Sequence, residues 1–199
     1  MHKQTIDTYN KLAKEYDEET QGFWEKFPYT FFDEFQKYVW RGKILDVGSG
    51  PGRDALILKQ KGFEVVCLDA SEKMVSMCKQ KGFETVLANF LEIPFADDTF
   101  DGVWAYTSLL HVSKKQITDA LTEIRRVLRP EGIFGLGMLE GEGEVIRDTK
   151  GVKEPRLFML YSQSELENIL DQNGFEILHF QKFQPRTSIY LNFIAKNIK

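Results

Sequence analysis

Residues 44–54 read Ile-Leu-Asp-Val-Gly-Ser-Gly-Pro-Gly-Arg-Asp, and this stretch decides the fold. An apolar, β-branched beginning leads to an acid, glycines alternate at Gly48, Gly50 and Gly52, and apolar residues 55–58 resume in a pattern suited to a helix. Glycine adopts backbone angles that a Cβ forbids, and it lets a ligand approach the main chain closely. The pattern predicts a strand, a tight turn and a helix N-terminus whose free N–H groups favour an anionic ligand group.

The spacing of these glycines distinguishes between nucleotide-binding motifs. A dinucleotide fingerprint would place its third glycine where Arg53 stands, and a phosphate loop would require Gly-Lys-Ser/Thr, which does not follow. The pattern Asp-x-Gly-x-Gly-x-Gly at residues 46–52 instead resembles the first motif of class I S-adenosylmethionine-dependent methyltransferases. The resemblance implies a cofactor-binding role for Asp46, Gly48, Gly50, Gly52 and Arg53.

Two later stretches strengthen the resemblance. Residues 94–106, Pro-Phe-Ala-Asp-Asp-Thr-Phe-Asp followed by Gly-Val-Trp-Ala-Tyr, look like the middle motif of the family, and Val-Leu-Arg-Pro-Glu-Gly at residues 127–132 resembles its last common motif. The resemblance implies a small, single-domain α/β protein over residues 1–199, with a Rossmann-like, doubly wound, seven-stranded sheet. That sheet would be mostly parallel and end in a C-terminal antiparallel hairpin. A helical N-terminal cap is expected at residues 1–40, and a cofactor-binding core at 41–199 with a substrate loop at about 140–161.

Composition sets the broad class. The 199 residues are 42% hydrophobic and 28% charged, which is ordinary for one globular domain with a sizeable core. A formal net charge of −4 argues against a nucleic-acid partner, because proteins that bind nucleic acids carry a basic face. Cys67 and Cys78 have no metal-ligand spacing, so we expect buried free thiols and no metal. The N-terminus carries no long apolar segment, so a soluble, cytoplasmic protein with no membrane contact is expected, and no feature sets an oligomeric state.

Hydrophobic periodicity predicts the secondary structure. Helices are expected at residues 5–19, 31–38, 54–61, 72–79 and 117–128, and from Ser162 or Ser164 to Gln172. Strands are expected at residues 42–47, 64–69, 84–88, 102–106, 133–139, 175–183 and 188–195. The polar, glycine-rich segment 140–154 is predicted to be a mobile loop over the ligand-binding edge of the sheet.

An acid ends the second predicted strand at Asp69. A carboxylate at this position suits the two hydroxyls of a ribose, as the resemblance also implies; the alternative is a helix N-cap, for which Ser71 is better suited. The resemblance places Ala70 and Met74 beside the adenine, and Asn89 near its amino group, although Asn89 also fits a plain turn. Phe90, Ala105 and Tyr106 complete the expected cofactor set.

Candidates for the acceptor side lie in the cap, after the fourth strand and late in the chain. Tyr9 and Tyr16 either approach the cofactor, as in the caps of similar methyltransferases, or only pack the helix onto the core. His111 follows the fourth strand at the ligand edge, where it takes a proton from the acceptor or is a structural histidine. Arg156 offers a planar fork of donors for a carboxylate or phosphate, or pairs with Glu154, and Tyr161 adds a hydroxyl.

Methyl transfer from a sulfonium is a direct displacement that needs alignment of the reacting atoms more than a covalent residue. We therefore expect an S-adenosylmethionine-dependent methyltransferase that releases S-adenosylhomocysteine and acts on an oxygen or nitrogen of a small, anionic acceptor. The alternatives are an RNA or protein methyltransferase and a catalytically silent S-adenosylmethionine-binding protein. The Asn-Pro-Pro-Tyr type of sequence used on base amines is replaced here by Ala-Tyr-Thr-Ser at residues 105–108, and the glycine spacing disfavours a nicotinamide dehydrogenase.

Overall fold

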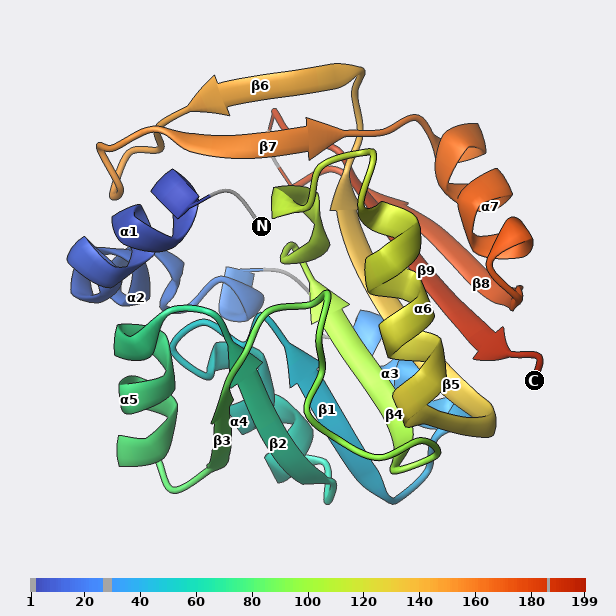
Figure 1. Cartoon of the computed structure of the whole chain (residues 1–199). Coiled ribbons are helices and arrows are strands. Elements are labelled where there is room, and N and C mark those ends of the chain that lie inside the picture. Colours follow the sequence, from blue (N-terminus) through green and yellow to red (C-terminus); the bar gives the residue numbers. More distant parts are fainter. Residues whose placement is uncertain (1–2, 27–29, 186) are drawn as a thin grey trace.

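A seven-stranded sheet forms the centre of the structure, a computed structural model that describes residues 3–26, 30–185 and 187–199 (Figure 1). Its strands are β1 (Lys43–Val47), β2 (Glu64–Asp69), β3 (Glu84–Leu87), β4 (Phe100–Tyr106), β5 (Leu128–Leu139), β8 (Phe175–Phe183) and β9 (Tyr190–Asn197). Their order across the sheet is β3-β2-β1-β4-β5-β9-β8. The first five pair in parallel, and β9 pairs antiparallel with both β5 and β8. This confirms the predicted sheet and its closing antiparallel hairpin.

Helices cover both faces of the sheet. One face carries α3 (Thr30–Tyr38), α4 (Arg53–Gln60) and α5 (Glu72–Gln80), and the other carries α6 (Ile117–Val127) and α7 (Gln163–Gln172). Residues along β4 alternate between the two apolar clusters, with Val103 and Ala105 on the α6 face and Trp104 and Tyr106 on the α3 face. Strands buried on both faces read as continuous apolar runs, which explains why the central strands were predictable.

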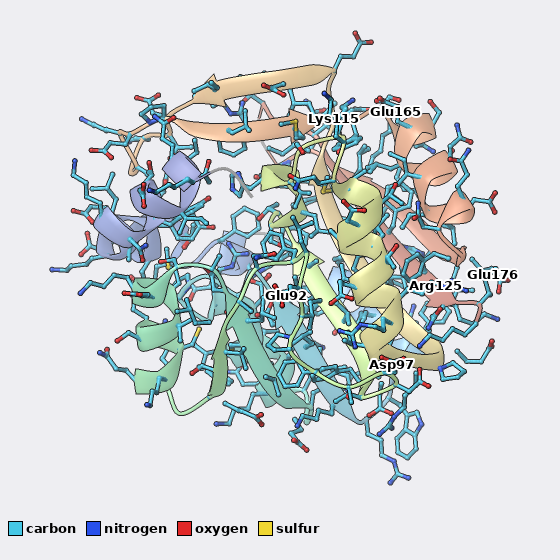
Figure 2. All side chains as sticks on the ribbon, in the orientation of Figure 1. Glu92, Asp97, Lys115, Arg125, Glu165 and Glu176 are labelled. Atoms are coloured by element: carbon cyan, nitrogen blue, oxygen red, sulfur yellow. The ribbon has the colours of Figure 1, made fainter. Side chains whose placement is uncertain are left out.

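Local capping fixes where two helices begin. The Ser71 hydroxyl accepts a hydrogen bond from Met74 N at the start of α5, and Ser162 and Glu165 form a reciprocal capping box at the start of α7. Ser162, of the two predicted serines, is thus the N-cap of α7. The Glu165 side chain lies where α7 approaches the segment before α6, near Lys115 (Figure 2), and its carboxylate pairs there with Lys114 at 2.8 Å.

The N-terminal segment forms two helices, so the predicted single helix over residues 5–19 is wrong. α1 (Lys3–Lys11) and α2 (Ala13–Thr20) are separated at Leu12 and are followed by a 3₁₀ turn, η1 (Trp24–Lys26). Tertiary hydrogen bonds fix the direction of α1. The Asn10 Oδ1 atom accepts from the Ser71 hydroxyl at 2.8 Å and from Lys73 N at 3.2 Å, which ties α1 to the start of α5. Contacts of this kind override local helix propensity.

The predicted mobile loop at residues 140–154 is also wrong, because it contains a strand. β6 (Gly143–Arg147) pairs antiparallel with β7 (Arg156–Leu160) in a separate two-stranded sheet, which crosses above the carboxyl ends of the central strands (Figure 1). β6 is mostly exposed and polar, so its own residues carry no strand pattern. Its order comes from β7, whose apolar residues Leu157, Phe158 and Met159 are buried in the core.

Candidate functional site

Two adjoining cavities lie at the carboxyl ends of β1, β2 and β4, where these strands face α1, α2 and the β6–β7 hairpin (Figure 1). Open α/β sheets bind their ligands at this edge. The inner cavity, of about 50 Å³, surrounds the glycine loop, and the outer cavity, of about 330 Å³, lies under the cap helices and the hairpin. The residues common to both linings, which mark the passage between the cavities, are Tyr9, Tyr16, Thr20, Arg53, Thr107 and His111.

The glycine loop is held tightly against the end of β2. The amides of Gly48 and Ser49 both donate to the Leu68 carbonyl, at 2.7 and 3.0 Å. Gly48 has φ +70°, and a Cβ built on it would overlap the side chain of Ser108. Only glycine combines this backbone angle with this close packing, so the loop leaves its main chain open to a ligand in the inner cavity.

Two buried acids behind the loop differ in how far their hydrogen bonds are satisfied. Asp54 accepts from the Trp24 Nε1 atom at 2.7 Å, from Arg53 Nε at 2.6 Å and from Trp104 Nε1 at 3.0 Å. The Oδ2 atom of Asp46 is buried with no partner among the described residues, and burial, reinforced by the charge of Asp54, raises the Asp46 pKa well above its usual range.

This unsatisfied oxygen tests whether S-adenosylmethionine fits the inner cavity. The methionine part of that cofactor carries an ammonium group and a carboxylate. An ammonium group would donate the hydrogen bond that Asp46 lacks. Arg53 lines the same cavity and donates to Asp54 through Nε, so its other guanidinium nitrogens can donate to the carboxylate. The donor set of the cavity therefore matches both charges of the cofactor.

Asp69 is fixed at the end of β2 beside the loop. Its Oδ2 atom accepts from Gly50 N at 2.9 Å and its Oδ1 atom from Ser71 N at 2.8 Å. Burial raises the pKa of Asp69 to about 6, although these backbone hydrogen bonds act in the opposite direction. Ser71, not Asp69, caps α5, and each Asp69 oxygen keeps lone-pair capacity for a further donor.

A hydrogen-bonded chain crosses the passage between the cavities. The His111 Nδ1 atom lies 2.6 Å from the Leu157 carbonyl and must donate to it, so Nε2 carries the lone pair and accepts from the Tyr9 hydroxyl at 2.8 Å. The Tyr9 oxygen accepts in turn from Arg156 Nη1 at 3.1 Å. Burial lowers the pKa of His111 to about 4, so the imidazole is neutral at physiological pH.

Thr107 contributes backbone strain to the same passage. It follows β4 with φ +56°, an angle that is unfavourable for a β-branched residue, and its N–H donates to the Gly137 carbonyl at 2.8 Å. Strain of this kind persists only where the surroundings over-determine it, and it is common at ligand-binding sites. Thr107 lines both cavities.

Most of the residues predicted from the sequence meet around these cavities. Those that line the inner cavity are Tyr9, Tyr16, Asp46, Gly48, Gly50, Arg53, Asp69, Met74, Phe90, Tyr106 and His111, and Arg156 lines the outer cavity. The structure does not bring Gly52, Ala70, Asn89, Ala105 and Tyr161 into either lining.

The structure gives most of these five residues other positions. Gly52 is the N-cap of α4, with φ +85°. The Asn89 Oδ1 atom accepts from Leu91 N at 2.7 Å, which is the turn role that the sequence left open. Ala105 and Tyr161 are fully buried in the apolar core, where the Lys114 ammonium lies over the Tyr161 ring at 4.5 Å from its centre.

Sequence reasoning missed several lining residues: Thr20, Ser49, Pro51, Asp54, Thr107 and Ser108. Asp54 directly follows the glycine motif, and its role as the anchor of Arg53 requires Trp24 and Trp104, which come from distant parts of the chain. Thr107 and Ser108 follow the fourth strand, so the rule that ligands bind beyond the carboxyl ends of strands was the signal that could have found them.

Membrane-spanning helices, metal-binding groups and disulfides are absent from the described part of the chain. None of its helices is long and apolar enough to cross a membrane. It holds no group of three or more side chains arranged to bind a metal ion. Both cysteines are free and buried, as predicted.

Comparisons with known proteins place the chain among methyltransferases. The profile of a family described as methyltransferase domain matches residues 45–136. The O-methyltransferase rstn1 of Aspergillus nomiae is 28% identical over 76% of this chain and 72% of its own length, and the uncharacterized methyltransferase sll0829 of Synechocystis is 30% identical over 68% of each chain.

The fold matches that of a solved structure with a bound cofactor product. It is the 1,6-didemethyltoxoflavin-N1-methyltransferase of Burkholderia thailandensis, with bound 1,6-didemethyltoxoflavin and S-adenosylhomocysteine. The TM-score is 0.76 at 19% identity, over 98% of this chain and 88% of the other. The motifs, the sheet order, the fit of the inner cavity and these relatives lead to one family: the chain belongs to the class I S-adenosylmethionine-dependent methyltransferases.

Proposed function

We propose that this protein transfers the methyl group of S-adenosylmethionine to an oxygen or nitrogen atom of a small-molecule acceptor bound in the outer cavity. The outer cavity is the observation that supports this proposal most directly. Its volume of about 330 Å³ falls at the lower end of the range for small-molecule sites, roughly 300–1,000 Å³. The cap helices and the β6–β7 hairpin supply much of its lining, and it meets the inner cavity at Tyr9, Thr107 and His111.

In this proposal the inner cavity holds the cofactor. The loop at Gly48 and Gly50 receives its methionine part, with Arg53 toward the carboxylate and Asp46 toward the ammonium group. Asp69 receives the ribose hydroxyls, and Met74 flanks the adenine. All six residues line the inner cavity, which supports the assignment.

When bound, the cofactor supplies a methyl carbon on a sulfonium, which is open to direct displacement by a lone pair. The residues of this chain orient the acceptor at the passage and exclude water from it. Orientation alone can contribute up to about 7–11 kcal/mol in well-aligned reactions. Tyr9 and His111, joined by their 2.8 Å hydrogen bond, are the side chains at the passage that would set this alignment.

A macromolecular acceptor fits this arrangement less well. It would have to thread one reactive group under α1, α2 and the hairpin. Hydrogen bonds join these elements: the Thr8 hydroxyl donates to the Pro155 carbonyl, and the Leu157 amide donates to the Thr5 hydroxyl oxygen. Thr149 and Gly151 donate to the carboxylate of Glu19. A small molecule needs only a transient opening of the cap.

Methyl-labelled S-adenosylmethionine tests this function. The protein is incubated with a panel of small acids, phenols and amines, and separately with tRNA, ribosomal RNA and protein extracts. We expect label in one or more small molecules and none above background in the macromolecules. If label appears only in the macromolecules, the protein is an RNA or protein methyltransferase and the proposal is wrong. If the cofactor binds but no acceptor is labelled, the protein is a catalytically silent S-adenosylmethionine-binding protein.

The cap is expected to open and close around ligands. Tyr9 and Tyr16 of the cap form part of the wall of the inner cavity, so the cap must move for a ligand to enter or leave. Hydrogen exchange of the amides in residues 3–20 should therefore slow when S-adenosylhomocysteine is added, because the ligand stabilises the closed form. Helix α7, which lines neither cavity, serves as the control, with unchanged exchange. If the amides of residues 3–20 exchange at the same rate with and without ligand, the cap does not open and close around the ligand.

A further inference from the structure

Arg156 is a buried cation without an acidic partner. It is 2% exposed, Nη1 donates to the Tyr9 hydroxyl at 3.1 Å, and Nη2 donates to Thr149 Oγ1 at 2.7 Å. Its Nε atom is buried and unpaired, and no carboxylate forms an ion pair with it within the described ranges. Glu154, the acid considered from the sequence, pairs with Lys11 instead. A buried guanidinium that lacks a counter-charge is costly, so this arrangement calls for an anion from outside the chain.

A second arginine adds to the same positive charge. Arg147 of β6 lies directly opposite Arg156 of β7 in the antiparallel register, where like charges destabilise the pairing. Both guanidiniums approach the Phe158 ring, with their central carbons 4.8 and 5.4 Å from its centre. Both side chains line the outer cavity.

An acid in the wall of the outer cavity already has hydrogen-bond partners. Glu19 is the one acid among the described residues that line the outer cavity. Its carboxylate accepts from Thr149 Oγ1 at 2.7 Å and from Gly151 N at 3.0 Å, so it reaches Arg156 only through the hydroxyl of Thr149. The hairpin end of the cavity therefore combines positive charge with aromatic rings, which suits an aromatic anion.

The passage offers no free group that removes a proton. His111 uses both nitrogens, Nδ1 toward Leu157 and Nε2 toward Tyr9, and the titratable or charged groups that face it are Tyr9 from α1 and Arg156 from β7. Burial, together with a smaller effect of the Arg156 charge, lowers the pKa of His111 to about 4, while burial raises the pKa values of Tyr9 and Tyr16. A base this weak is poorly matched to a neutral hydroxyl or an ammonium group.

We propose that the acceptor is an aromatic acid that enters already ionised, with Arg156 and Arg147 receiving the anionic group that becomes methylated, and that His111 positions Tyr9 and Arg156 instead of acting as a base. This inference rests on the proposed function. The anionic oxygen or nitrogen forms the bond to the methyl carbon while the carbon–sulfur bond breaks and its electron pair stays on sulfur. Anion and sulfonium become two neutral products, and no proton is released. The methylated product loses the charge that Arg156 held, which favours its release.

Binding to the protein saturated with S-adenosylhomocysteine tests the anion site without requiring turnover. Benzoate, phenylacetate and cinnamate are titrated by calorimetry beside the amide of each acid. We expect at least one acid to bind tenfold or more tightly than its amide. Arg156→Gln should abolish this preference, Arg156→Lys should keep part of it, and Arg129→Gln, which changes an exposed arginine elsewhere, should keep all of it.

The controls separate this inference from the proposed function. S-adenosylhomocysteine should bind equally to the wild type and the Arg156 variants, because Arg156 does not line the inner cavity. If the wild-type protein does not bind S-adenosylhomocysteine, the proposed function itself is wrong. Normal binding of S-adenosylhomocysteine together with no acid bound, or with amides bound as tightly as acids, would overturn only the anionic acceptor.

A pH profile tests the role of His111. For every acid in the panel that is methylated, kcat/KM should follow the acceptor's own ionisation, so that the pH of half-maximal rate differs from one acceptor to the next. His111→Gln should lower the rate without moving that pH. A half-maximal pH that is the same for all acceptors and is lost in His111→Gln would show that His111 is a base and would overturn the positioning role.

Discussion

Replacing Gly48 with alanine is expected to remove detectable binding of S-adenosylmethionine and to lower the melting temperature. The backbone at Gly48 has φ +70°, an angle that costs an L-residue roughly 1–3 kcal/mol. The added Cβ would also overlap the Ser108 side chain, whose hydroxyl holds the Val47 carbonyl at 2.6 Å. Relief of this overlap must shift the loop or the end of β4, and both form the wall of the inner cavity.

Gly82 provides a matched control for this variant. It has φ +79°, close to that of Gly48, but a Cβ at Gly82 would meet nothing within 4 Å. Gly82→Ala should therefore show the backbone strain alone, with a smaller loss of melting temperature and unchanged cofactor binding. Calorimetry and thermal unfolding of both variants give the comparison. Equal cofactor affinity in a folded Gly48→Ala protein would contradict the position of the loop under the ligand.

Asp69→Ala is expected to weaken cofactor binding by roughly 10- to 100-fold while the protein stays folded. The substitution removes the carboxylate proposed to hold the ribose, and charge-assisted hydrogen bonds contribute about 1.5–3 kcal/mol each. It also leaves the amides of Gly50 and Ser71 without their side-chain acceptor, which loosens the loop. Asp171→Ala, an exposed position near the end of α7, is the control for loss of an acid, and calorimetric titration with S-adenosylhomocysteine is the measurement. If the affinity of the folded variant is unchanged, Asp69 does not bind the ribose of the cofactor.

Cofactor affinity should depend on pH through the same residue. Because burial raises the pKa of Asp69 to about 6, the free protein holds a proton on this carboxyl below that pH, and the proton must leave before charged hydrogen bonds form. The affinity is therefore expected to fall about tenfold between pH 7 and pH 5. The stability of the free protein should change in the opposite sense, since the stabilising contribution of the neutral carboxyl is lost as pH rises through about 6. Asp69→Asn should flatten both dependences, and a wild-type affinity that is constant from pH 5 to pH 7 would contradict the shifted pKa.

The parts of this protein that were predictable are those whose cause is local. Three features follow from neighbouring residues alone: the continuous apolar runs of β1, β2 and β4, the glycine turn at residues 48–52, and the serine cap of α5. The same local logic placed Asp69 at a strand end beside the glycine loop, where the structure has it.

The parts that were not predictable depend on distant partners. The break at Leu12 accompanies the bonds of Asn10 to the start of α5, and β6 is ordered by an apolar partner strand. The charge environment of Arg156 shows the same limit. From the sequence, Glu154 was the expected ion-pair partner of Arg156. In the structure Glu154 forms an ion pair with Lys11, and Arg156 lines the outer cavity.

A crystal structure of this protein with bound S-adenosylhomocysteine tests the central claim most directly. The account predicts the ribose hydroxyls within hydrogen-bonding distance of Asp69, the amino group at Asp46, and the sulfur directed toward Tyr9, Thr107 and His111 at the passage to the outer cavity. A ligand that occupies the outer cavity beside Arg156, or that leaves the glycine loop without contact, would contradict it.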